Sequence, residues 1–518
     1  MSAGEVAAPG SAAGDSANRH PVALATVLGV LFLTFLDTTI VSVTLGSVQK
    51  SFGAGVISLQ WVVNAYALVF ASLMLLCGSL SDRFGRKTVM LGGIAVFCAG
   101  SLLAATAPNV GTLIAGRAVM GVGAAASEPG TLSMIRQLYP DAGRRARALG
   151  AWAAVSGLAL ASGPVIGGLL VAAGDWRAVF WFSLGAGLVL LAAASAVLPN
   201  SADPQPGRLD LRGFVLGTAA LGATIFAVII GEQHGFGSAP VVALFVLGGI
   251  SLLLFGPVEL RERSPMLDLH YMRAPTIGSA LFMAFAVYFG VFSIFFFTAL
   301  YLDVAVGYSG LKLAALFTPM AIAIVGGSLF SGSWVARAGS RWPMVVGSVI
   351  GAAGILLTRP VLDVDPAFRS LSITLAIAGL GFGIAVVPLT SAVLGTMPAA
   401  MSGMAASATN TARQIGAVVG VAALGALVNA HLTSDLSDRL TRLGIGGGAR
   451  DLIINAVESG GSGDGFDIAH PPAIFAPIVD QATAAFRTGL HQALLASALL
   501  MLLAAVITSV AARRPSEG

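Results

Sequence analysis

Fourteen apolar runs of membrane length follow one another along the chain and limit what it can fold into. An α-helix needs about 20 apolar residues to cross a bilayer, and backbone groups in lipid must be satisfied within the helix itself. Only 10% of the residues are charged, against about 25% in soluble domains. The sequence therefore predicts an all-α polytopic membrane protein. We place the spans at residues 22–48, 58–79, 88–107, 110–134, 148–173, 178–198, 212–231, 239–258, 276–301, 311–331, 343–358, 371–394, 404–429 and 488–511.

An even number of spans puts both chain ends on one side of the membrane. The loops on that side hold more lysine and arginine than the loops on the other side, for example at Arg83, Arg86 and Lys87. Cytoplasmic loops carry such an excess, so we expect both termini in the cytoplasm. The excess of arginine over lysine hints at a GC-rich bacterial genome, and the expected location is a bacterial inner or plasma membrane.

One loop sequence occurs twice. The segment Gly78–Lys87 (GSLSDRFGRK) reappears in weaker form 254 residues later as Gly332–Arg341 (GSWVARAGSR), each time after the second span of a group of six. Paired six-helix halves with a central site between them are a known transporter design. The expected organisation is a cytoplasmic tail (1–20), a first half (21–200), a linker with two inserted spans (201–265), a second half (266–511) with an external, flexible loop (430–486), and a second tail (512–518).

The first span contains a carboxylate, Asp37. An acid at this depth costs roughly 2.5 to 3.5 kcal/mol on insertion scales, so it usually faces a cavity or a partner charge and marks an ion pathway. Arg117 lies in the fourth span, which runs in the opposite direction, and helix rise puts both groups in the outer half of the membrane. A nearby arginine favours ionised Asp37 and desolvation favours the neutral form, as a proton-binding site requires. A static ion pair that only fixes packing is the alternative.

Glu128 lies 11 residues after Arg117, about three helical turns, and therefore on the same face of the fourth span. Pro129 follows it and removes an intrahelical hydrogen bond, which opens a polar pocket for a second protonation site. The alternative is a glutamate whose side chain reaches toward the cytoplasm.

Several stretches resemble the fourteen-span drug/proton antiporters of the major facilitator superfamily. They are the loop Gly78–Lys87, Leu36–Val41 (LDTTIV) in the first span, Leu113–Ala125 in the fourth, the pattern of Gly150, Gly163, Pro164 and Gly167 in the fifth, and Asn410–Gly416 in the thirteenth. The resemblance implies the major facilitator fold, with two six-helix halves and two inserted central helices. The chain departs from the pattern at Ala336, which replaces the acid of the second loop, and at Asp303, which stands where glutamine is common.

Candidate substrate ligands lie in the second half. Asn410 and Arg413 are one turn apart near the middle of a span, where they contact substrate, organise the site, or only form interhelical hydrogen bonds. An aromatic stripe has helical spacing and offers stacking and cation–π surface if it faces the cavity. If it faces lipid, it is ordinary. Its members are Phe285, Phe289, Phe292 and Phe296.

Two features are candidates for gating. Asp82, with Arg83 and Arg86, is expected to brace the cytoplasmic gate through charge pairs and helix-end contacts. The alternative is that these charges only set the topology. Gly163, Pro164 and Gly167 make the fifth span thin and bendable, so that the two halves approach closely and rock.

The sequence has no G-x-x-x-x-G-K-[ST] loop for ATP and no close Cys/His cluster, so we expect neither an enzyme nor a cofactor or metal. The prediction is a proton-coupled exporter of lipophilic, often cationic small molecules, working as a single chain in the lipid bilayer without nucleic acid. A dedicated exporter of one antibiotic or metabolite, an uptake symporter or uniporter, and a non-transporting receptor or scaffold remain as alternatives.

Overall fold

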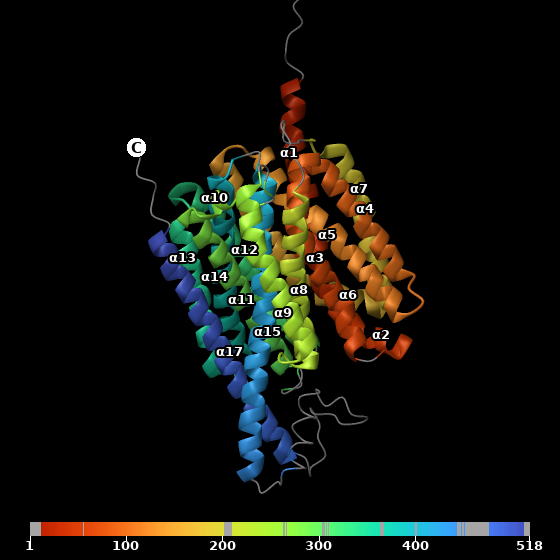
Figure 1. The fold of residues 1–518 in the computed structure, drawn as a ribbon, viewed down its shortest axis with the longest axis vertical. Helices are drawn as coiled ribbons and strands as arrows, with labels where there is room; N and C mark the ends of the chain where they lie inside the picture. Colours follow the sequence, from red (N-terminus) through yellow and green to blue (C-terminus); the bar gives the residue numbers. More distant parts are fainter. Residues whose placement is uncertain are drawn as a thin grey trace, which may run out of the picture.

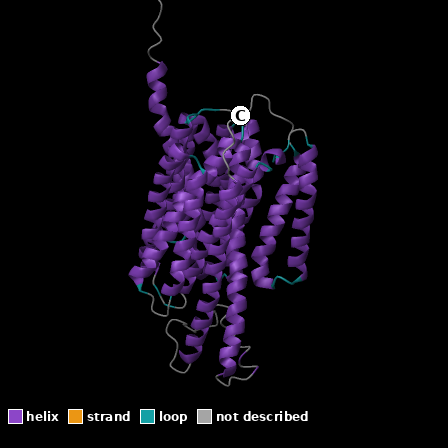
Figure 2. Ribbon diagram, turned by 90° about the vertical axis from the view of Figure 1, so that its left-hand side faces the viewer, coloured by secondary structure: helices purple, strands orange, loops and turns teal. Residues whose placement is uncertain are grey.

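The described part of the chain is helical. The computed structural model describes residues 12–54, 56–200, 210–262, 265, 267–302, 306, 308, 310–362, 367–398, 401–442, 447, 450 and 476–511, and no strand occurs within these ranges (Figure 2). The long helices are α1 (Ala12–Ile40), α3 (Val56–Phe84), α4 (Arg86–Ala105), α5 (Val110–Leu138), α6 (Ala142–Ala173), α7 (Arg177–Val197), α8 (Leu211–His234), α9 (Ala239–Arg261), α11 (Pro275–Leu300), α12 (Gly310–Ala338), α13 (Arg341–Thr358), α14 (Phe368–Thr396), α15 (Ser402–Arg442) and α17 (Ala476–Ala511). The short ones are the 3-10 helices η1 (Val41–Thr44) and η3 (Arg359–Val361), and the α-helices α2 (Leu45–Phe52) and α10 (Leu269–Met272).

The number of membrane spans agrees with the sequence. Among the described residues, thirteen helices are long and apolar enough to cross a membrane, and α6 becomes the fourteenth if its two segments, Ala142–Leu160 and Val165–Ala173, count as one span bent by 45°. The start of α1 and the end of α17 lie at the same end of the bundle, at the top of Figure 1. We call this side the terminal face and the other side the opposite face.

The spans form two groups of six. Helices α1 and α3–α7 pack together as the first half, and α11–α15 with α17 form the second half. Glycines allow close helix pairs in each half: a Cβ on Gly100 of α4 would lie 2.6 Å from the backbone nitrogen of Met120 on α5, and one on Gly347 of α13 would lie 2.6 Å from that of Ala385 on α14. The inserted pair, α8 and α9, stands in front of the bundle in Figure 1, where α8 packs against both α3 and α15.

The internal repeat is present in three dimensions. Gly85 joins α3 to α4 and Gly339 joins α12 to α13, and these equivalent glycines have positive φ values of 98° and 75°, a conformation that costs glycine little. The basic residues two positions after these glycines are also equivalent. Lys87 donates to the carbonyl of Ser195 near the end of α7 (2.6 Å), and Arg341 donates to that of Ser509 near the end of α17. Each half therefore uses a cation to cap its last helix.

The ends of several helices differ from the expectation, because hydropathy marks the apolar centre of a span whereas local chemistry ends a helix. The first span is not one continuous α-helix. It ends at Ile40 and continues as η1, within a run rich in β-branched residues where the hydroxyl of Thr44 donates to the carbonyl of Val41 (2.7 Å).

The two ends of the segment 430–486 are helical, where flexible turns were expected. Helix α15 runs on to Arg442 and α17 begins at Ala476, and both extend beyond the other helices on the opposite face (Figure 1). Leu432, Leu436 and Leu440 of α15 form a cluster with Ala482 and Ala485 of α17. Residues 1–11, 201–209, 451–475 and 512–518 and Asp303 lie outside the described residues.

Candidate functional site

Asp37 and Arg117 meet inside the first half, as the helix-depth argument predicts. Asp37 lies in the last turn of α1 and Arg117 in α5, and both side chains are 0% exposed. Arg117 donates through Nη1 to Asp37 Oδ2 and through Nε to the carbonyl of Val62 (2.9 Å). Its guanidinium also lies 4.5 Å from the ring centre of Tyr66. The partner charge, the carbonyl and the ring together offset the cost of burying the pair.

Each member of this pair keeps one polar atom without a partner among the described residues, namely Asp37 Oδ1 and Arg117 Nη2. The hydroxyl of Tyr66 is engaged elsewhere, since it donates to the carbonyl of Thr34 at 3.0 Å. Oδ1 is thus an unsatisfied acceptor on a buried carboxylate. A proton can bind to Oδ1 without displacing Arg117 from Oδ2. Chemically, the pair is suited to bind and release a proton.

Glu128 is the second buried acid, and its hydrogen bond joins the two halves. The side chain projects from α5, is 1% exposed, and accepts a hydrogen bond from Nδ2 of Asn410 on α15. It therefore does not reach toward the membrane surface. Its other oxygen, Oε1, has no donor among the described residues. A charge change at Glu128 acts directly on a contact between the halves.

Asn410 connects Glu128 to Arg413. The Oδ1 atom of Asn410 accepts from Arg413 Nη1 at 2.8 Å, and Arg413 Nη2 donates to the hydroxyl of Thr390 on α14. The guanidinium carbon of Arg413 lies 4.8 Å from the ring centre of Trp152 on α6 and 5.5 Å from that of Tyr288 on α11. An acid, an amide, a cation and two aromatic rings thus meet at the boundary between the halves.

Sequence reasoning missed Trp152, Tyr288 and Thr390. The chain has only six tryptophans and six tyrosines, and a single large aromatic residue inside a span rich in alanine and glycine was the available signal. Nothing in local spacing shows that Trp152 of the first half and Tyr288 of the second half lie on the same guanidinium.

The aromatic stripe of α11 does not line the central site as a unit. Phe285 and Phe289 contact each other at 5.8 Å between ring centres, and Phe292 stacks on Tyr288 at 5.9 Å. Phe296 is 47% exposed. The ring of α11 that contacts Arg413 is Tyr288, which is not a member of the stripe. Phe292 lies next to the central cluster through its contact with Tyr288.

The halves also meet at the terminal face. Both carboxylate oxygens of Asp82, near the end of α3, accept from backbone amides at the start of α15, those of Gly403 (2.9 Å) and Met404 (3.0 Å), and Arg86 contacts the same carboxylate at 3.3 Å. The structure thus brings Asp82 to a helix end, where a negative charge is favourable. Arg83 does not join this contact and lies over the ring of Phe84, 5.4 Å from its centre.

A second contact at this face was not foreseen. Arg136, in the last turn of α5, donates to the carbonyls of Met397 (2.7 Å) and Pro398 (3.3 Å) just after α14. Carbonyls at a helix C-terminus attract a cation. The connection between α14 and α15 is therefore held from the first half by an acid at one end and an arginine at the other.

The fifth span bends where glycine and proline predict. The bend in α6 falls between Leu160 and Val165, around Gly163 and Pro164. Proline at 164 leaves the carbonyl of Leu160 without its helical donor, and Thr39 of α1 donates its hydroxyl to that carbonyl at 3.0 Å. A Cβ on Gly163 would lie 3.0 Å from the backbone nitrogen of Ile40. Gly167 is also buried. The bend is thus tied to α1 two residues after Asp37.

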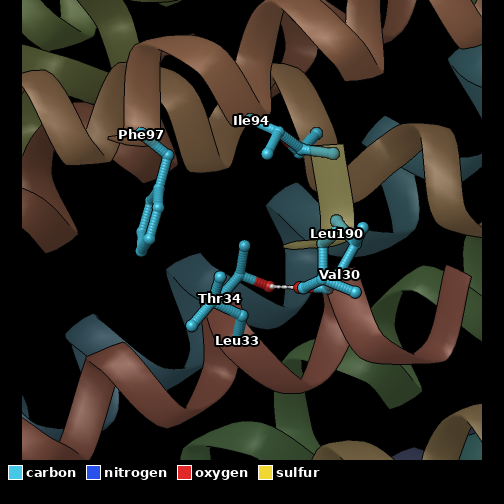
Figure 3. Close-up of a pocket in the computed structure, with 7 residues that line it drawn as sticks. Val30, Leu33, Thr34, Ile94, Phe97 and Leu190 are labelled. Atoms are coloured by element: carbon cyan, nitrogen blue, oxygen red, sulfur yellow. Dashed lines mark hydrogen bonds between the residues drawn. The ribbon is translucent and has the colours of Figure 1, made fainter. Parts of the chain in front are cut away.

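A small apolar pocket lies within the first half, among α1, α4, α5 and α7 (Figure 3). Its lining residues are Val30, Leu33, Thr34, Ile94, Phe97, Ser127 and Leu190. The hydroxyl of Thr34 donates to the carbonyl of Val30 (3.2 Å), which leaves an apolar lining. Neither acid nor Arg413 lines this pocket, so it is separate from the central cluster. Within the described residues, no group of three or more His, Cys, Asp or Glu side chains is arranged to hold a metal ion.

Comparisons with known proteins identify the family. The family model of the Major Facilitator Superfamily matches residues 27–421. Multidrug resistance protein Stp of Mycobacterium tuberculosis (strain CDC 1551 / Oshkosh) is 32% identical over 81% of this chain and 78% of its own length. Multidrug efflux pump LfrA of Mycolicibacterium smegmatis is 32% identical over 96% of this chain and 97% of its own. The crystal structure of the human organic anion transporter MFSD10 superposes with a TM-score of 0.62 at 13% identity, covering 94% of this chain and 99% of that one, and shows the fold alone. The chain belongs to the major facilitator superfamily.

Proposed function

We propose that this chain is a proton-coupled exporter of lipophilic, often cationic small molecules, which works as a single chain by alternating access in a bacterial plasma membrane. The observation that carries the proposal is the Asp37–Arg117 pair, a fully buried acid with one unsatisfied oxygen inside a membrane span. A charged pair at such a depth is costly and marks an ion pathway. Export is supported by the relatives, whose names describe multidrug resistance and multidrug efflux.

The terminal face is assigned to the cytoplasm. It carries Lys87, Arg136 and Arg144, in keeping with the excess of positive charge in cytoplasmic loops. The contacts of Asp82 and Arg136 close the halves together on this face. The arrangement is thus closed to the cytoplasm, and a proton that reaches Asp37 comes from the opposite side.

Proton binding at Asp37 has a direct route to the shape of the first half. Neutral Asp37 no longer balances Arg117, so the ion pair weakens and the end of α1 is free to shift. Thr39 transmits such a shift, because its hydroxyl holds the carbonyl of Leu160 at the bend of α6. Helix α6 packs against α12 and α14 of the second half, so its movement changes the contact between the halves.

The energy available is sufficient for useful export. When one proton is exchanged for an uncharged substrate, one elementary charge moves across the membrane, and at 100 mV this yields about 2.3 kcal/mol. That free energy supports a substrate gradient of roughly fifty-fold.

The test is the variant Asp37→Asn, which keeps the shape of the side chain and removes its charge. In vesicles with an imposed proton gradient, we expect it to abolish proton-driven efflux of a fluorescent lipophilic cation such as ethidium. The amount of folded protein in the membrane should match that of the wild type. The matched control is Asp175→Asn, at an exposed acid paired with Arg177, which should transport normally. Undiminished proton-driven efflux by Asp37→Asn would refute the proposal.

A further inference from the structure

Arg413 is a buried cation that no described carboxylate contacts directly. Its two terminal nitrogens bond to Asn410 and Thr390, and its Nε atom has no partner among the described residues. The rest of its stabilisation comes from the rings of Trp152 and Tyr288. Two aromatic faces and a nearby acid are the elements with which proteins bind organic cations. Arg413 therefore occupies a place with the properties of a cation site.

The residues around Arg413 belong to different halves of the protein. Tyr288, Thr390 and Asn410 lie on α11, α14 and α15 of the second half, together with Arg413. Trp152 and Glu128 lie on α6 and α5 of the first half. When the halves separate, Arg413 leaves with its own half, so Trp152 loses the cation on its ring and Glu128 loses its hydrogen bond from Asn410.

The part that stays on the first half is preorganised. The hydroxyl of Thr131 accepts from Trp152 Nε1 at 3.0 Å and donates to the carbonyl of Glu128 at 2.7 Å, so one residue orients the indole beside the helix turn that bears the acid. Phe35 packs edge-on against Trp152, with 6.3 Å between ring centres. A fixed indole face, linked through Thr131 to the turn that carries a buried acid, favours a positively charged, flat or lipophilic ligand.

We propose that Glu128 and Trp152 form the subsite for the positive charge of a lipophilic organic cation, and that Arg413 fills it as an internal substitute between transport cycles. This inference rests on the proposed exporter function and names the substrate class of the same site. An anion bound to Arg413 is the opposite assignment. It would place a second negative charge beside Glu128, which is unfavourable in a buried site.

The test compares two probes of the same shape and opposite charge, tetraphenylphosphonium and tetraphenylborate. Binding is measured by equilibrium dialysis with the full-length protein in lipid nanodiscs. We expect the wild type to bind the phosphonium and to prefer it over the borate. Glu128→Gln should weaken phosphonium binding about tenfold and Trp152→Leu several-fold, since each removes one of the two groups of the subsite.

Arg413→Gln is the decisive variant, because it removes the substitute cation. It should tighten phosphonium binding about three- to tenfold. Trp181→Leu is the matched control for Trp152→Leu, since Trp181 is 48% exposed on the outside of the bundle, and it should bind as the wild type does. Weaker phosphonium binding by Arg413→Gln, or a wild-type preference for the borate, would overturn the inference.

The binding assay needs no proton gradient. Absence of proton-driven efflux in the wild type would therefore defeat the exporter proposal and leave phosphonium binding to be measured. Loss of the charge preference would defeat only the subsite.

Discussion

Two helix–helix contacts between the halves, α3 with α15 and α6 with α12, close the terminal face. We call them seams, and the internal repeat makes them equivalent in position. In the α3–α15 seam, Gly78 and Gly403 approach so closely that a Cβ on Gly78 would lie 2.7 Å from the carbonyl oxygen of Gly403. In the α6–α12 seam, a Cβ on Gly150 would lie 2.9 Å from the carbonyl oxygen of Ser328, and one on Gly332 would lie 2.7 Å from that of Ala146. Small residues thus bring backbones into contact in both seams.

The seams differ in charge. In the α3–α15 seam, Asp82 of the first half caps the start of α15 in the second half. The equivalent residue, Ala336, faces the start of α6, with 3.7 Å between its Cβ and a Cβ placed on Gly143. There α6 is capped by its own Asp141, which accepts from the amide of Arg144 at 2.8 Å and does not join the halves. Opening the terminal face therefore breaks charge–helix contacts at one seam and mainly packing contacts at the other.

The largest expected effect comes from packing in the α6–α12 seam. Gly332→Ala adds a methyl group against the carbonyl of Ala146, a backbone atom that cannot rotate away. Overpacking of this kind costs about 1–3 kcal/mol, and separation of the seam relieves it. The population that is open at the terminal face should rise about tenfold or more. The measurement is double electron–electron resonance between spin labels on Phe84 of α3 (56% exposed) and Thr396 of α14, both on the terminal face.

The matched control lies six residues away on the same helix. A Cβ on Gly326 would meet no atom within 4 Å, so Gly326→Ala should leave the distance distribution unchanged. If both variants behaved alike, helix propensity rather than contact between the halves would be the cause, and the packing account of this seam would be wrong.

The sequence alone predicts the features that depend on local spacing and depth. The apolar runs predict the spans, the two related loops predict the equivalent turns at Gly85 and Gly339, and helix rise predicts that Asp37 and Arg117 meet. Each follows from the geometry of one helix or of two antiparallel helices of known depth. The approach of Asp82 to a helix end follows from charge and helix-dipole reasoning in the same way.

The contacts between the halves could not be predicted. Glu128 and Asn410 are far apart in the sequence, and their hydrogen bond depends on how two six-helix units pack. The same holds for Trp152 on Arg413 and for Arg136 on Met397. Helix ends such as that of α1 at Ile40 were also missed, because hydropathy does not report where β-branched residues change the helix type.

An intermediate effect is expected from the acid of the α3–α15 seam. Asp82→Asn keeps a side-chain acceptor but removes the charge that two amides of α15 and Arg86 share. Charged contacts at a partly buried helix start are worth roughly 1–2 kcal/mol, so the open population should rise about five- to thirtyfold in the same spin-label assay. The exposed Asp175→Asn on the opposite face serves as the charge control. A shift equal to that of the control would mean that the acid sets topology and does not hold the gate.

The smallest effect is expected from Arg136, at the α14 end of the connection between α14 and α15. Arg136 holds the carbonyls of Met397 and Pro398 after α14, and a cation at a helix C-terminus contributes about 0.3–1 kcal/mol. Arg136→Gln should therefore raise the open population only about two- to fivefold. Arg144→Gln, at an exposed arginine on the same face, is the matched control and should change nothing.

Asp82 and Arg136 hold the two ends of one connection, that between α14 and α15. The double variant Asp82→Asn, Arg136→Gln should therefore raise the open population by less than the product of the two single effects. Strictly multiplicative effects would show that the acid and the arginine act on separate elements, and the charged seam would then be two independent contacts.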